Sequence, residues 1–143
     1  MPKILYNLFF VSALTLSIVW SSACKAQTPL RITEAPKFKL LQAFMCEDVR
    51  EGIPQGRGVA FSVSRGKICC YTLIDGIKED SVIYHSWISR DKPTAKFKLS
   101  LKETRWATFS SIQLRDDDKG PWRVEILNAN GKLLRTLRFS VVD

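Results

Sequence analysis

Residues 95–102 read Ala-Lys-Phe-Lys-Leu-Ser-Leu-Lys, an unbroken alternation of apolar and polar side chains. Successive side chains of a β-strand point to opposite faces of a sheet, so a strand here would bury Phe97, Leu99 and Leu101 together. Its polar face would carry Lys96, Lys98 and Lys102. The stretch therefore predicts a strand over Ala95–Leu101 with one face in a core and the other in solvent.

A second stretch, near the C-terminus, predicts a β-hairpin. Two runs rich in β-branched and large apolar residues, Trp122–Leu127 and Leu133–Val142, are separated by Asn128-Ala129-Asn130-Gly131. An Asn-Gly step readily adopts the positive φ angles of tight hairpin turns. We therefore expect these two strands to pair directly in antiparallel fashion.

Short alternating runs of this kind continue back to residue 38, and turns rich in polar residues or glycine separate them. Arg65-Gly66-Lys67 predicts a hairpin turn, whereas Gly52–Gly58, which contains Pro54, predicts a loop. The runs are Phe38–Val49, Val59–Ser64, Ile68–Ile74, Val82–Ser89, Ala95–Leu101, Arg105–Leu114, Trp122–Leu127 and Leu133–Val142. Without helical periodicity, this pattern predicts an all-β domain, an immunoglobulin-like antiparallel β-sandwich of about seven strands.

The N-terminus has a different composition. Lys3 precedes an apolar run over 4–20, which small residues follow. This layout is typical of a secretory signal peptide. We expect a signal peptide over 1–26, a linker over 27–37 with two prolines, and the β-sandwich domain over 38–143.

The processing of this segment has several possible forms. Cleavage could follow Ala23 or Ala26, because small residues occupy the two recognition positions in both cases. Ser21-Ser22-Ala23-Cys24 is also compatible with a lipoprotein signal ending at Ala23, in which Cys24 would be acylated. A retained membrane anchor is a further alternative. These forms place the domain in the periplasm or tethered to a membrane at the cell envelope.

The charge of the chain limits its partners. The formal charge is +8 at pH 7, and residues 1–26 hold two lysines and no acidic residue, so the remainder carries +6. Positive charge in an exported protein favours contact with anionic surfaces. The partners we expect are an envelope polymer, an anionic membrane surface or another envelope protein. Nucleic acid is not expected, because no basic cluster with interleaved aromatic residues or known module is present.

Exposed aromatic and basic residues could form a binding surface. The candidates are His85, Trp87, Trp106, Trp122, Lys96, Lys98 and Lys102. Indole rings bind flat apolar faces of ligands, but they also fill the cores of β-sandwiches. Lysines on a strand could bind anions or could simply keep an exposed face soluble.

His85 is the only histidine, and no paired-carboxylate or triad spacing accompanies it. We therefore expect a hydrogen-bonded structural histidine and no enzymatic activity. Asp116-Asp117-Asp118 lacks the spaced oxygen ligands of a calcium loop, so a solvated turn is expected there. No motif indicates a cofactor.

Three cysteines lie in the predicted domain, Cys46, Cys69 and Cys70. Neighbouring strand residues point to opposite faces, so at most one of the last two could pair with Cys46. A disulfide from Cys46 to Cys69 or Cys70 and buried free thiols are both open. A thiol or metal protein that uses these cysteines with His85 is the alternative function, although the C-x-x-C spacing of zinc sites is absent.

Three stretches resemble a known family when taken together. They are Tyr84-His85-Ser86-Trp87, Arg105-Trp106-Ala107-Thr108-Phe109-Ser110-Ser111 and Gly120-Pro121-Trp122-Arg123-Val124-Glu125-Ile126-Leu127, followed by Gly131 and Phe139. In this order they resemble the bacterial domain of unknown function 2914, over roughly Lys37 to Val142. The resemblance implies an exported or membrane-attached protein with a small all-β domain and brings no catalytic residues. The function that we expect is a non-enzymatic binding or interaction module of the cell envelope.

Overall fold

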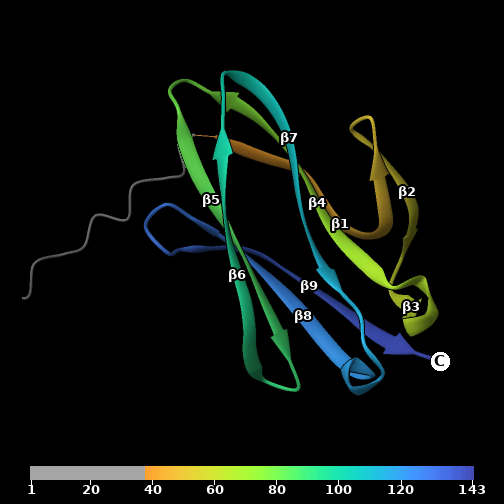
Figure 1. Ribbon diagram of the computed structural model, residues 1–143. Coiled ribbons are helices and arrows are strands. Elements are labelled where there is room, and N and C mark those ends of the chain that lie inside the picture. Colours follow the sequence, from red (N-terminus) through yellow and green to blue (C-terminus); the bar gives the residue numbers. More distant parts are fainter. Residues whose placement is uncertain (1–37) are drawn as a thin grey trace, which may run out of the picture. The chain divides into compact units, whose positions relative to one another are not determined.

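The computed structural model describes residues 38–143, which form two packed β-sheets (Figure 1). The predicted signal peptide, the linker and the possible lipidation site Cys24 lie outside the described residues. Within residues 38–143, no helix is long and apolar enough to cross a membrane. The all-β prediction is confirmed, and the only helical elements described are two short 3-10 turns, η1 (Val63–Arg65) and η2 (Asp116–Asp118).

One sheet has four strands and the other has five. The first sheet runs in the order β2 (Ile53–Gly58), β1 (Lys39–Arg50), β4 (Lys67–Ile77), β7 (Thr104–Gln113). The second runs in the order β3 (Ala60–Ser62), β9 (Leu133–Val142), β8 (Gly120–Asn128), β5 (Ser81–Ser89), β6 (Lys92–Leu101). Neighbouring strands are antiparallel except β3, which lies parallel to β9.

The core fills the space between the sheets. Trp87 is fully buried there, and its ring packs edge-on against Phe139 with the ring centroids 6.1 Å apart. The alternation over residues 95–101 behaves as predicted, because Leu101 is fully buried and Phe97 and Leu99 pack against the core. The apolar inner faces of the longer strands therefore supply the surface that holds the two layers together.

The predicted C-terminal hairpin is confirmed. Strands β8 and β9 pair in antiparallel register from Gly120 opposite Val141 to Leu127 opposite Leu133. Gly131 adopts a φ of 77°, a conformation that a residue with a side chain rarely adopts. The side-chain oxygen of Asn128 accepts hydrogen bonds from the backbone N–H groups of Asn130 (3.0 Å) and Lys132 (2.8 Å). Local turn chemistry thus determines this hairpin.

Two local predictions are wrong. The stretch predicted as a loop, Gly52–Gly58, contains strand β2, which pairs with β1. Pro54 is tolerated there because β2 is an edge strand. The turn at Arg65–Lys67 does not close a hairpin, because β3 and β4 belong to different sheets. The chain crosses between the sheets at η1, and residues 38–143 form nine strands instead of the expected seven or so.

Candidate functional site

A polar network crosses the interior of the sandwich and contains His85. Trp87 on β5 donates its indole N–H to Ser110 Oγ on β7 (3.0 Å), and that oxygen lies 2.8 Å from Nδ1 of His85. On the other side of the ring, Nε2 lies 3.5 Å from the hydroxyl of Thr72, which donates to the backbone oxygen of Thr108 (3.2 Å). The network therefore connects the two sheets through one buried imidazole.

One proton arrangement satisfies all of these groups. Ser110 accepts from Trp87 and has a single proton, which it donates to Nδ1 of His85. The ring is then neutral with its proton on Nε2, directed at Thr72. Burial lowers the pKa of His85 to about 4 from its usual 6.5, which agrees with a neutral ring at pH 7. His85 is therefore a neutral, hydrogen-bonded member of the core.

The contact between Ser110 and His85 has the distance of a nucleophile and its base, but it is sealed from solvent. His85 is 0% exposed and Ser110 is 5% exposed. The indole of Trp87 also donates to the serine hydroxyl, so this oxygen is packed against core side chains and is not presented to solvent. The pair links β5 of the five-stranded sheet to β7 of the four-stranded sheet.

Of the two roles considered for the tryptophans, core packing holds for two of the three. Trp87 and Trp122 are 0% and 4% exposed, and the ring of Trp122 stacks on Phe139 within the core. Its indole N–H donates to the backbone oxygen of Asp118 at 2.6 Å, which closes the η2 turn over the core. Trp106, at 36% exposed, is the one of the three that reaches solvent. His85, Trp87 and Trp122 are therefore removed from the candidate binding surface.

Basic side chains gather on the outer face of the five-stranded sheet. Lys96 and Lys98 on β6 point outward as predicted, whereas Lys102 lies beyond the end of that strand. The ammonium of Lys96 lies 4.7 Å from the ring centre of Tyr84, a cation–π contact with the neighbouring strand β5. This face therefore offers a basic edge with an aromatic ring beside it.

Three arginines surround a small hollow at one end of this face. Arg90, Arg123 and Arg138 line it together with Asp91, and its volume is about 130 Å³. Arg123 and Arg138 occupy directly opposite positions on β8 and β9, beside the turn that carries Arg90 and Asp91. We call this feature the arginine hollow.

The charges around the arginine hollow are partly compensated. Arg123 donates to Glu125 at 2.9 Å and forms an ion pair with Asp91. These two carboxylates raise the pKa of the Arg123 guanidinium, Glu125 more than Asp91. Arg138 forms no ion pair with a carboxylate of residues 38–143. The hollow therefore keeps an excess of positive charge.

Glycine and backbone contacts position Arg90. Its guanidinium donates to the backbone oxygen of Lys119, and its own N–H donates to the oxygen of Pro121 at 3.1 Å. Gly120 has a φ of 122°, and a Cβ at this position would lie 3.2 Å from Nε of Arg90. The Gly120-Pro121-Trp122 stretch therefore leaves room for Arg90 and anchors the strand that carries Arg123.

The cysteines separate by face. Cys70 lies in the main core between the sheets, whereas Cys46 and Cys69 belong to a second cluster with Tyr71 on the outer side of the four-stranded sheet. A bond from Cys46 to Cys70 and a shared site of Cys46 or Cys69 with His85 are therefore excluded by geometry. Within residues 38–143 no group of three or more His, Cys, Asp or Glu side chains could hold a metal ion.

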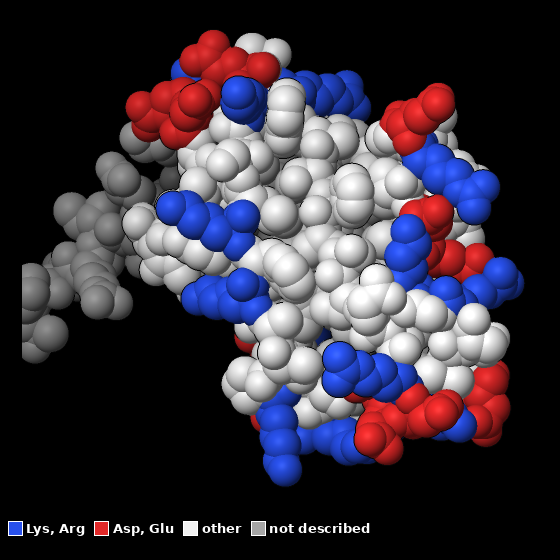
Figure 2. All heavy atoms as spheres, in the orientation of Figure 1, with Lys and Arg blue, Asp and Glu red and all other residues white. Residues whose placement is uncertain are grey.

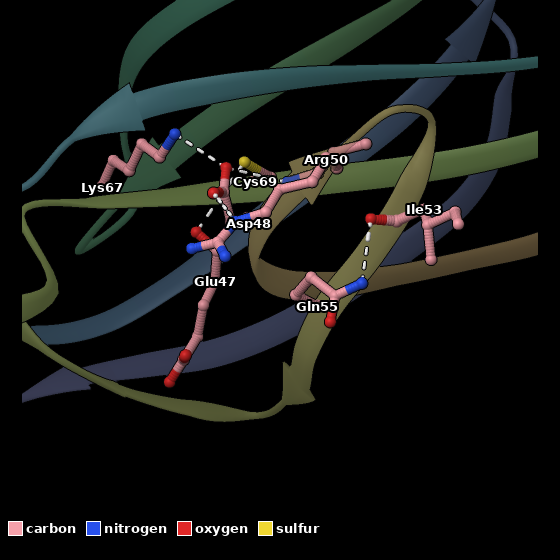
Figure 3. Close-up of polar contacts among 8 residues, drawn as sticks. Glu47, Asp48, Arg50, Ile53, Gln55, Lys67 and Cys69 are labelled. Carbon is pink, nitrogen blue, oxygen red and sulfur yellow. Dashed lines mark hydrogen bonds and ion pairs between the residues drawn. The ribbon is translucent and has the colours of Figure 1, made fainter.

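A charged pair lies next to the outward cysteines (Figure 3). Lys67 is 2.7 Å from Asp48, which also pairs with Arg50 at 3.1 Å. The two cations lower the pKa of the Asp48 carboxyl to about 2, Lys67 more than Arg50. Lys67, which forms the ion pair with Asp48, lies two residues before Cys69 on the same face of β4. The cysteine pair therefore lies beside an ion pair, in which Lys67 lowers and Asp48 raises the pKa of the Cys69 thiol.

Sequence reasoning did not find Arg90, Arg123 and Arg138. The signal for two of them was available, because the confirmed hairpin places Arg123 opposite Arg138. Two positive charges at opposite strand positions repel each other and destabilise the sheet. Such a pair therefore indicates that a negative charge lies nearby, either a bound anion or a carboxylate of the protein. Arg90 lies in a turn on another strand pair, and only the folded arrangement of β5 beside β8 brings it to them.

The comparisons with known proteins identify part of the chain. Residues 80–141 match a family described as a protein of unknown function, DUF2914, and this match begins directly before β5 and continues into β9. The three stretches that carried the resemblance all lie inside the matched residues, but the match does not reach back to Lys37. No curated protein matches the chain. Residues 80–141 are therefore a domain of the DUF2914 family.

Proposed function

We propose that the chain is a non-enzymatic binding module that holds anionic groups of a partner in the arginine hollow. The observation that supports this most is the placement of Arg123 directly opposite Arg138, with Arg90 on the same hollow. Guanidinium groups present several N–H donors in a plane that matches phosphate, sulfate and carboxylate oxygens. The hollow has the size of one such group.

Asp91 indicates how the site would work. Its carboxylate is 89% exposed and contacts Arg123, so it occupies the position of an internal anion at the rim of the hollow. Because an exposed ion pair contributes little to stability, an arriving anion replaces Asp91 at small cost. Lys96 and Lys98 on β6 lie on the same face and extend the basic surface across the sheet. A ligand with repeated anionic groups binds the arginine hollow and these two lysines at the same time.

The ligand that fits this arrangement best is an anionic polymer of the cell envelope. Strands in a sheet lie about 4.8 Å apart. In the order β9-β8-β5-β6, Arg123 on β8 is two strand spacings from the lysines of β6 and Arg138 on β9 is three. A polymer with regularly spaced charges spans this distance, whereas one small anion fills only the hollow. The other partners considered, a membrane surface and a second envelope protein, become outcomes of the test below.

The finer fold type supports a binding role. The parallel pairing of β3 with β9 and the sheet order β9-β8-β5-β6 agree with a variable-type immunoglobulin sandwich. In that fold a buried tryptophan lies on the strand called C, and we assign this position to β5, which carries the buried Trp87. We propose this immunoglobulin-like assignment together with export by the N-terminal signal and a location in the periplasm or tethered at the envelope. In such folds function resides in surface sites.

Replacing Arg138 by glutamate tests the site. Loss of a charged hydrogen bond costs about 1.5–3 kcal/mol, so affinity for dextran sulfate is expected to fall roughly tenfold or more. The matched control is Arg135→Glu, which makes the same charge change on the same strand at a position opposite Ile126. Calorimetric titration of both variants with dextran sulfate gives the comparison.

A third variant is expected to raise the affinity for dextran sulfate instead of lowering it. Asp91→Asn removes the internal anion, so it is expected to strengthen binding several-fold. Equal losses in Arg138→Glu and Arg135→Glu would show that only net charge matters and would contradict a defined site. Binding to vesicles with anionic lipid, but not to dextran sulfate, would assign the surface to a membrane instead of a polymer.

A further inference from the structure

Cys46 on β1 and Cys69 on β4 lie at directly opposite positions of two antiparallel strands. Residues opposite each other in such a pair have Cα atoms about 4.5–5.5 Å apart, within the range that a disulfide spans. Both side chains point to the outer side of the four-stranded sheet. Cys70 points to the other side, into the main core, and cannot reach either of them.

The two thiols already contact each other. A side-chain hydrogen bond joins Cys46 and Cys69, and Cys69 Sγ lies 4.0 Å from the backbone oxygen of Glu47. The hydrogen bond from Cys46 lowers the pKa of the Cys69 thiol, and the nearby charge of Lys67 contributes in the same direction. The same contact and burial raise the pKa of the Cys46 thiol. Cys69 is therefore the more acidic of the two thiols.

The position of the pair differs from that of an inert core thiol. Among residues 38–143, Cys46 and Cys69 cluster with Tyr71 and the partly buried Phe44 and Leu73, on the side of the four-stranded sheet that faces away from the five-stranded sheet. Small movements of these side chains expose the sulfurs, whereas exposing Cys70 requires the two sheets to separate. In the view of Figure 2, charged side chains lie around the border of the visible face and its middle is mainly uncharged.

We propose that Cys46 and Cys69 are a redox-active pair that exchanges with small disulfides and forms a reversible cross-strand disulfide. The Cys69 thiolate attacks one sulfur of the small disulfide and releases its other half as a thiolate, giving a mixed disulfide. Cys46 then loses its proton to the released thiolate and attacks the Cys69 sulfur. The second half leaves as a thiolate and takes up from water a proton equivalent to the one that Cys69 lost on ionisation. Two protein thiols and one small disulfide become one protein disulfide and two small thiols.

The test uses the full chain with Cys24→Ser in every sample, since the sequence holds four cysteines. The folded protein is incubated with glutathione disulfide, its remaining thiols are alkylated, and its peptides are mapped by mass spectrometry. We expect a Cys46–Cys69 link with Cys70 alkylated only after unfolding. Reduced glutathione is expected to restore both thiols while circular dichroism shows a folded chain throughout.

Matched variants locate the chemistry. Cys70→Ser is expected to keep the link, whereas Cys46→Ser and Cys69→Ser lose it. Cys46→Ala removes the hydrogen-bond donor to Cys69, so it is expected to slow alkylation of Cys69 near neutral pH. If a variant does not fold, the peptide map of the Cys24→Ser chain decides alone. Three unlinked thiols at every glutathione ratio, a link that includes Cys70, or a link that only a denaturant allows to be reduced would overturn the proposal.

Discussion

Replacing Trp87 by alanine is expected to lower the free energy of unfolding by about 3–5 kcal/mol, the cost of deleting a buried tryptophan from a packed core. Its side chain is 0% exposed and packs against Phe139. The substitution also removes the indole donor to Ser110, leaving that hydroxyl with one partner fewer in the interior. Because small domains have about 5–15 kcal/mol of stability in total, this change removes a large part of it.

Urea unfolding followed by far-ultraviolet circular dichroism measures this loss. The control is Trp106→Ala, which deletes the same side chain where it is 36% exposed on the edge strand β7. Its effect is expected to stay below about 2 kcal/mol, because less of the ring is buried. Similar midpoints for the two variants would show that Trp87 is not the centre of the core.

Acidification from pH 7 to pH 4 is expected to lower the free energy of unfolding by about 3 kcal/mol through His85 alone. The unfolded chain binds a proton below its usual pKa of 6.5, whereas the folded chain binds it only near pH 4. The contribution of the neutral ring is therefore fully present above pH 6.5 and is lost as the pH falls to about 4. Asp48, with its pKa lowered to about 2, titrates below this window.

The variant His85→Gln provides the comparison, since the chain has no other histidine. Glutamine is neutral at every pH and keeps hydrogen-bonding groups for Ser110 and Thr72, so the histidine-dependent slope between pH 6.5 and pH 4 should disappear. Equilibrium unfolding in urea at several pH values gives both curves. Parallel curves for the wild-type chain and the variant would mean that His85 is not held neutral in the core.

Much of the fold follows from local chemistry. The alternation over 95–101 correctly placed Lys96 and Lys98 outside and Leu101 inside, and Asn128–Gly131 specified the last hairpin. Strand β2 was missed because its proline and glycines argue against a strand, and only the partner β1 makes it one. The hairpin predicted at Gly66 failed because local turn residues do not say which sheet the next strand joins.

The candidate site was less predictable, and for a physical reason. Lys96 and Lys98 lie on one strand, so alternation alone reveals them, but the arginine hollow combines β8, β9 and the turn after β5. The cysteines show the same limit. Alternation separated Cys69 from Cys70, but only the register of β1 against β4 selects Cys69 as the neighbour of Cys46.

The most direct test of anion binding in the arginine hollow is to map it by nuclear magnetic resonance on the isotope-labelled chain titrated with dextran sulfate. Binding there predicts that the largest shifts of amide signals fall on residues 90–91, 122–124 and 137–139, which surround the hollow. Smaller shifts are expected along β6 near Lys96 and Lys98. Shifts confined to the four-stranded sheet, or no shifts at dextran sulfate concentrations that saturate binding, would contradict the proposed function.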